Sequence, residues 1–132
     1  MRIIDRQKIV ETVSKLCIES ALFLPCDVYN ALEEAKNKET QPVAKEIFSQ
    51  LLENADIAKE EETPICQDTG LAIVFAELGR EIYMDYDIYE AINEGIGKGY
   101  TEGFLRKSIV RHPLDRVNTE NNTPGVIHHH GQ

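Results

Sequence analysis

The chain has 132 residues, of which 42% are hydrophobic and 28% charged, and its formal net charge at pH 7 is -9. This length and apolar fraction suit a single domain, residues 1–132, with its own core. The acidic excess argues against nucleic acid or an anionic membrane as a partner. No apolar run is long enough to span a membrane, and early charges interrupt any leader, so we expect a cytoplasmic protein.

The first part of the chain, residues 1–60, is predicted to be mainly helical. Apolar residues at helical spacing predict helices over residues 5–20, 28–36 and 42–59. Thr40 is the expected cap of the third helix, in front of a proline that suits the first helical turn. These helices should form a layer that supports the second part of the chain.

The remaining residues, 61–132, are predicted to contain a cysteine loop, strands, one helix and ligand-binding loops. The apolar run 71–78 reads as a buried strand, followed by a turn and a short return strand over residues 82–84. Residues 87–100 read as a helix. The predicted fold class is therefore α+β, with a helical N-terminal layer packed on a small mixed β-sheet.

Glycines are concentrated in and after the last predicted helix, at Gly95, Gly97, Gly99 and Gly103. A phosphate-binding loop is one interpretation, but no lysine followed by serine or threonine stands in the required register. Close helix packing and a helix end are the preferred interpretation, because glycine is typical of both. We assign no nucleotide to them.

The three cysteines, Cys17, Cys26 and Cys66, are odd in number and widely spaced. This pattern favours neither a disulfide framework nor a self-contained zinc site. Cys17 continues an apolar helical face and is expected in the core. Cys26 has no assigned role beside Asp27, the expected cap of the second helix.

A polar cluster stands directly before the predicted buried strand, in Thr63-Pro64-Ile65-Cys66-Gln67-Asp68-Thr69-Gly70. It combines a thiol, an amide and a carboxylate with a turn glycine. Because proline fixes the approach and glycine permits the turn, we expect the strand to hold this loop rigidly. Cys66, Gln67 and Asp68 are the first candidates for a functional site.

Two arginines, Arg106 and Arg116, lie in a turn-rich segment of the last third. Arginine binds carboxylates through a planar, two-pronged fork. Placed beside Gln67 and Asp68, either one would make a receptor for a small dicarboxylic acid. The alternative is an ordinary surface ion pair.

Several ordered motifs run along nearly the whole chain: Leu24-Pro25-x-Asp27-Val28, Pro64-x-Cys66-Gln67-Asp68-Thr69-Gly70, Arg106-x-Ser108, Pro113-Leu114-x-Arg116-x-Asn118-Thr119, and Asn122-Thr123-Pro124-x-Val126-Ile127-His128. Together they resemble the class I, iron–sulfur-dependent fumarate hydratases and the related L-tartrate dehydratases. The similar part is the N-terminal portion of the alpha-type catalytic region of these enzymes.

The resemblance implies a [4Fe-4S] cluster held by three cysteines, with Cys66 as the first ligand and the fourth iron open to substrate. Such an iron would act as a Lewis acid on a hydroxyl and a carboxylate together, which hydration of an unactivated alkene dicarboxylate needs. The resemblance places the other two ligands in downstream sequence that this chain lacks.

The resemblance also implies roles for individual side chains. Gln67 and Asp68 would contact substrate, with Asp68 a catalytic candidate in proton transfer. Arg106 would hold a substrate carboxylate, whereas Arg116 and Asn118 would organise the adjoining loop.

The expected function is that of an iron–sulfur hydro-lyase component, inactive alone, with fumarate hydratase as the main interpretation. An L-tartrate dehydratase component, or a non-catalytic assembly or regulatory module that keeps the fold, is the alternative. The implied partners are a C4 dicarboxylate, a beta-type subunit or C-terminal domain, and a second copy in a homo-oligomer.

A run of histidines, His128-His129-His130, lies near the end of the sequence. Only the first matches the motif. Adjacent histidines without supporting side chains rarely make a physiological metal site, so we expect none here.

Overall fold

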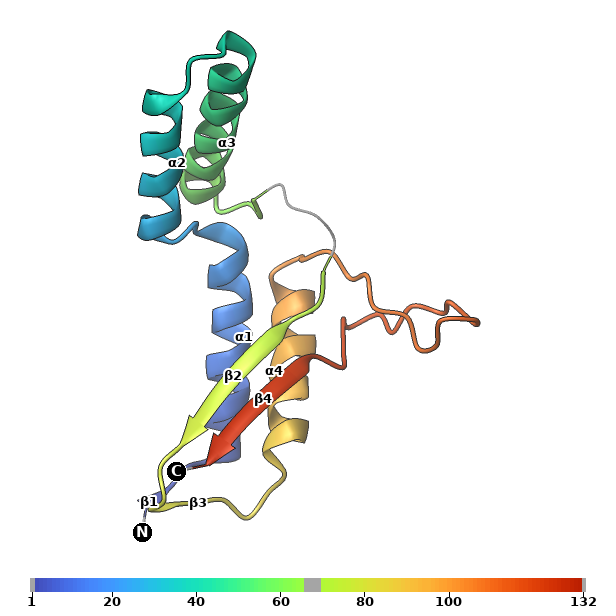
Figure 1. The fold of residues 1–132 in the computed structure, drawn as a ribbon. Helices are drawn as coiled ribbons and strands as arrows, with labels where there is room; N and C mark the ends of the chain where they lie inside the picture. The colour runs from blue at the N-terminus through green and yellow to red at the C-terminus, as the bar shows by residue number, and fades with distance from the viewer. Residues whose placement is uncertain (1, 66–69, 132) are drawn as a thin grey trace. The chain divides into compact units, whose positions relative to one another are not determined.

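A computed structural model describes residues 2–65 and 70–131. These residues form four helices, α1 (Arg6–Leu22), α2 (Cys26–Lys38), α3 (Pro42–Glu61) and α4 (Ile88–Glu102), and four strands, β1 (Arg2–Ile3), β2 (Ile73–Leu78), β3 (Ile82–Tyr83) and β4 (Val126–Gly131) (Figure 1). The predicted α+β class is confirmed. No helix in the described part of the chain is both long and apolar enough to cross a bilayer.

The described residues divide into two compact units, one of residues 2–18 and 70–131 and the other of residues 19–65. In the second unit, α2 and α3 pack side by side (Figure 1). The Tyr29 hydroxyl donates a hydrogen bond to the Asp56 carboxylate across this pair, at 3.1 Å. The buried side chains of α3 are Leu52, Ala55 and Ala58.

Two small sheets, each of two parallel strands, lie in the first unit. β2 pairs with β4 over their whole lengths, and β1 pairs with β3. The apolar run 71–78 is predicted to be a buried strand, but this is wrong: side chains of β2 alternate between exposed and half-buried, so the strand is covered on one face only. The half-buried side chains pack on a core cluster of Val13 from α1 and Ile88, Ile92 and Ile96 from α4.

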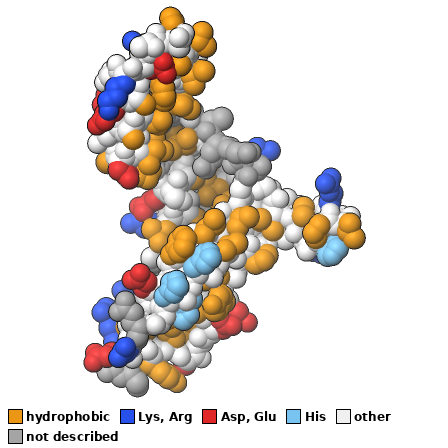
Figure 2. All heavy atoms as spheres, viewed as in Figure 1, with side chains coloured by type: hydrophobic (Ala, Val, Ile, Leu, Met, Phe, Trp, Pro, Cys, Tyr) orange, Lys and Arg blue, Asp and Glu red, His pale blue; other side chains and the backbone are white. Residues whose placement is uncertain are grey.

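The other face of the β2–β4 sheet is exposed and carries apolar and imidazole groups. Phe75 is 74% exposed, and its ring stacks on that of His128 with 4.9 Å between ring centroids. Figure 2 shows histidine side chains gathered among hydrophobic ones over these strands.

The close contact between α1 and α4 explains the helical glycines. A Cβ atom on Gly95 would lie 2.7 Å from the Val13 Cβ, and one on Gly99 would lie 2.8 Å from the backbone oxygen of Ser14. Gly103 is the C-cap residue of α4. Helix packing and a helix end, the preferred interpretation of these glycines, are therefore confirmed.

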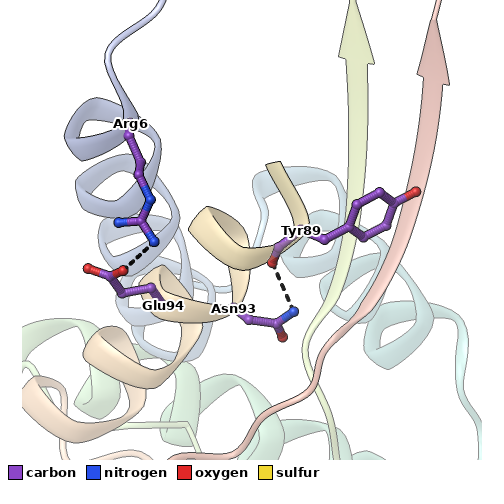
Figure 3. Close-up of polar contacts among 4 residues, drawn as sticks. All are labelled: Arg6, Tyr89, Asn93 and Glu94. Carbon is purple, nitrogen blue, oxygen red and sulfur yellow. Dashed lines mark hydrogen bonds and ion pairs between the residues drawn. The ribbon is translucent and has the colours of Figure 1, made fainter. Parts of the chain in front are cut away.

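Polar contacts also fix α4 within the first unit (Figure 3). A guanidinium nitrogen of Arg6 on α1 lies 2.7 Å from a carboxylate oxygen of Glu94. The Asn93 amide nitrogen donates to the backbone oxygen of Tyr89, and its oxygen accepts from the Gly125 amide at 2.9 Å. Asn93 thus ties α4 to the residue that precedes β4.

The helix positions follow the sequence prediction, but two predicted caps are wrong. The N-cap of α3 is Gln41 rather than Thr40, and it makes no side-chain cap hydrogen bond. The Glu39 carboxylate accepts the Thr40 and Gln41 amides instead. Asp27 lies inside the first turn of α2, after Pro25 at the N-cap, where its charge favours the positive end of the helix dipole.

The predicted return strand forms at β3, but its partner is β1 rather than β2. The backbone oxygen of Glu81 accepts a hydrogen bond from the Arg2 amide at 2.7 Å. β3 and the Glu81 residue before it therefore hold β1 in place.

We expect Gly99→Ala to destabilise the protein relative to Gly97→Ala. Both changes gain about 1 kcal/mol of helix propensity. A Cβ at Gly97 would meet its nearest neighbour, Asn121, at an ordinary 3.5 Å, whereas one at Gly99 clashes with backbone. Overpacking costs about 1–3 kcal/mol, so urea unfolding should separate the two variants by that amount. Equal stabilities would show that α1 and α4 are not in close contact.

Candidate functional site

Three of the predicted site residues, Cys66, Gln67 and Asp68, lie outside the described residues. Gly70 is the first described residue after them. Its backbone oxygen accepts a hydrogen bond from the Ser108 hydroxyl at 2.9 Å and another from the Asn122 amide nitrogen at 3.4 Å. The residue that leads out of the cysteine loop is therefore held by two segments from the last third of the chain.

The start of β2 is fixed from the same side. The backbone oxygen of Ala72 accepts a hydrogen bond from the Val126 amide at 2.8 Å. A Cβ atom on Gly125 would lie 3.1 Å from the same oxygen and 2.5 Å from the Ile96 Cδ1 atom. A Cβ atom at residue 125 would therefore need the end of the Ile96 side chain to shift and would fit tightly against the strand.

Residues 109–119 form an arm that doubles back on itself. The Arg111 amide donates to the backbone oxygen of Val117 at 2.8 Å, and the Thr119 amide donates to that of Ile109 at 2.9 Å. In Figure 1 this arm, drawn in orange, extends away from β2, β4 and α4. The first and last residues of the arm lie close together, so the residues just before the arm are neighbours of those just after it.

Arg106 lies just before the arm, on backbone that is held on both sides. Leu105 is buried, and its amide donates to the backbone oxygen of Tyr100 at 3.0 Å. The backbone oxygen of Lys107 accepts a hydrogen bond from the Asn118 amide nitrogen at 3.0 Å. The Arg106 side chain is exposed and makes no hydrogen bond or ion pair with any other residue in 2–65 or 70–131. A fixed backbone thus presents an accessible guanidinium.

Arg116 and Asn118 are placed differently from Arg106. Arg116 is exposed at the turn of the arm, with φ 55°, and its amide donates to the backbone oxygen of His112. Both polar atoms of the Asn118 side chain hydrogen-bond to the backbone. Its nitrogen donates to the Lys107 oxygen, and its oxygen accepts from the Glu120 amide at 2.7 Å. These contacts suit residues that organise the loop.

Asn122 lies in one of the motifs, but the sequence alone indicates no role for it. Its side chain is 0% exposed, and its oxygen accepts from the amides of Ser108 at 2.7 Å and Ile109 at 3.1 Å. Burial raises the pKa of the Tyr100 phenol, and the side chain of Asn122 acts against this rise. An asparagine just before Thr-Pro, among other polar residues, was the available signal.

The two described cysteines do not form a metal site. Cys17 is half-buried against the core cluster, as predicted, and burial raises the pKa of its thiol. Cys26 is exposed at the start of α2. Within the described ranges there is no group of three or more His, Cys, Asp or Glu side chains that could hold a metal ion. These residues therefore do not fit an iron–sulfur cluster.

What the described part of the candidate site offers is an accessible guanidinium on a fixed backbone. An exposed guanidinium stands two residues before Ser108, whose hydroxyl holds the backbone that follows the cysteine loop. Guanidinium groups recognise carboxylates through paired, charge-assisted hydrogen bonds. Proton transfer, in contrast, would need groups outside this set.

Comparison with known proteins gives consistent matches along the chain. The profile of the family described as fumarate hydratase (Fumerase) matches residues 10–131. A Methanocaldococcus jannaschii protein, named as a candidate L(+)-tartrate dehydratase subunit alpha, is 44% identical over 117 residues, covering 87% of this chain and 41% of that protein. The L(+)-tartrate dehydratase subunit alpha of Escherichia coli strain K12 is 27% identical over 116 residues, covering 88% and 38%. The chain thus spans about two fifths of the length of these curated relatives.

Proposed function

Because the chain belongs to the fumarate hydratase family of iron–sulfur hydro-lyases, we propose that residues 1–132 supply the N-terminal part of an alpha-type catalytic region. In this role the chain binds a C4 dicarboxylate and contributes to the addition or removal of water. The observation that supports it best is the exposed Arg106, on a segment bonded to Gly70 at the end of the cysteine loop.

L(+)-tartrate is the substrate that we propose first. The support is the alpha-subunit relatives, which are named for tartrate dehydratase in both an archaeon and a bacterium. This favours an L-tartrate dehydratase component, the alternative that the sequence left open, over fumarate hydratase. Fumarate is the second candidate, because the matching family profile carries the name of fumarate hydratase.

Arg106 is proposed to hold one carboxylate of the substrate. The fixed backbone on both sides of Arg106 places the base of its side chain before substrate arrives, so little further ordering is needed on binding. Gln67 would contact the substrate through its amide. Asp68 would do so through a carboxylate that can accept or return a proton.

A [4Fe-4S] cluster is the proposed cofactor, with Cys66 as its one ligand from this sequence. Cys17 and Cys26 do not complete the set, so the other ligands would come from further sequence. When bound, such a cluster supplies a Lewis acid for the hydroxyl that leaves or enters.

The naming of the relatives as alpha subunits supports a beta-type subunit, or an equivalent C-terminal domain, as the partner. We also propose a homo-oligomer, with a second copy of the chain. The assembled enzyme is then the form in which activity should be sought, and this chain alone should be inactive.

The substrate is tested by assaying the anaerobically assembled enzyme that contains this chain with L(+)-tartrate and with fumarate. We expect kcat/KM for tartrate to exceed that for fumarate by about tenfold or more, equivalent to about 1.4 kcal/mol of transition-state discrimination. The reverse order would assign the chain to fumarate hydration. Turnover of neither substrate would favour the non-catalytic module.

Loss of the Cys66 thiol should abolish the cluster. In the assembled enzyme that carries Cys66→Ser, we expect bound iron, visible absorbance and hydro-lyase activity all to fall to background, because a serine hydroxyl is a poor iron ligand. Cys26→Ser is the matched control, since Cys26 is exposed at a helix start and should retain iron and activity. Full iron content in Cys66→Ser would remove Cys66 from the ligand set.

Replacement of Arg106 should weaken substrate binding. Charge-assisted hydrogen bonds contribute about 1.5–3 kcal/mol, so Arg106→Gln should raise KM by about tenfold to a hundredfold. The KM of Arg106→Lys should lie between those of the wild type and Arg106→Gln, because lysine keeps the charge but lacks the two-pronged guanidinium. Arg80→Gln, at an exposed arginine between β2 and β3, is the control. An unchanged KM in Arg106→Gln would reduce Arg106 to a surface cation.

A further inference from the structure

The side chain of Asn122 is fully buried, although Asn122 belongs to no helix or strand. Three hydrogen bonds hold this side chain. The oxygen accepts two backbone amides, those of Ser108 and Ile109, and the side-chain nitrogen donates to the Gly70 oxygen. We call this set the Asn122 junction: Asn122, Gly70, Ser108 and Ile109.

The junction connects the two parts of the proposed site. Gly70 directly follows the cysteine loop, and Ser108 lies two residues after Arg106. Ser108 adds a second link, because its hydroxyl donates to the same Gly70 oxygen that the Asn122 amide contacts. Because the Asn122 side chain is fully buried, an arrangement that broke its hydrogen bonds would leave its amide group unpaired.

We propose that Asn122 is a positioning residue, whose side-chain amide sets the place of Arg106 relative to Gly70, the last residue of the cysteine motif in the sequence. This inference rests on the proposed function. Asn122 acts through Arg106 and does not itself contact substrate.

The backbone of Asn122 offers a way to separate side-chain from main-chain effects. Its φ of 59° is in the left-handed region, which glycine, asparagine and aspartate tolerate best. Asn122→Asp therefore keeps the shape and the backbone preference but loses both N–H donors. Asn122→Gly keeps the backbone and loses the whole junction.

A matched control is available two residues earlier. Glu120 has φ 65° and an exposed side chain, and it contributes no side-chain hydrogen bond to the junction. Glu120→Gly should leave the kinetic constants within about twofold of the wild type.

The kinetic test uses the assembled enzyme. We expect Asn122→Asp to raise KM by about tenfold, with Ser108→Ala, a gentler change that removes one link to Gly70, shifting KM in the same direction. In the Arg106→Gln background, Asn122→Asp should have little further effect on KM, because its effect passes through Arg106. Additive effects, or a wild-type KM in Asn122→Asp, would overturn the proposal.

A second measurement keeps the inference distinct from the proposed function. Amide hydrogen exchange on this full chain reports the Ser108 and Ile109 amides directly. Both should exchange at least about tenfold faster in Asn122→Gly than in Glu120→Gly, while core amides of α4 stay protected. Unchanged exchange of the Ser108 and Ile109 amides in Asn122→Gly would overturn the proposal. An inactive wild type with altered exchange would refute the hydro-lyase assignment and leave the coupling of the two segments standing.

Discussion

The close contact of α1 with α4 is the constraint on which the first unit depends. Glycine at 95 and 99 allows backbone-to-side-chain distances that no other residue permits, and this lets Ile92 and Ile96 reach the core beside Val13. The inner face of β2 and β4 then rests on these side chains. Larger residues at the two positions would separate the helices and leave the strands without a surface to cover.

The same contact determines where the site lies. Ile96 occupies the space beside Gly125, and Asn93 holds the Gly125 amide, so α4 fixes the chain immediately before β4. Asn122 lies three residues earlier and is placed by this anchor. The segments that it joins have little regular secondary structure, so their backbone N–H groups need partners from side chains. Asn122 provides two such partners with one oxygen.

The local structure was largely predictable, whereas the long-range contacts were not. Apolar periodicity located the helices, and the apolar run 71–78 located β2 but did not reveal that one of its faces is exposed. The predicted cap at Thr40 is wrong, and the carboxylate of the preceding Glu39 accepts the Thr40 backbone amide instead. Strand partners and the junction depend on residues far apart in sequence, such as Asn122 and Gly70, which are separated by 52 positions. Motifs drew attention to Arg106, but only the contacts show what holds its backbone.

A binding arginine on a loop must be both accessible and preorganised, and these demands conflict. Burial would order the guanidinium but remove it from substrate, and full exposure of a mobile loop would cost ordering entropy on binding. In this chain the backbone of Arg106 meets the demand for preorganisation, and its side chain meets the demand for accessibility. The backbone around Arg106 is fixed through Leu105, Lys107 and the Asn122 amide, and the side chain alone reaches solvent. In the proposed role of Arg106, a buried side-chain amide that fixes the Ser108 backbone and an exposed guanidinium two residues earlier meet both demands, which accounts for a fully buried asparagine at position 122.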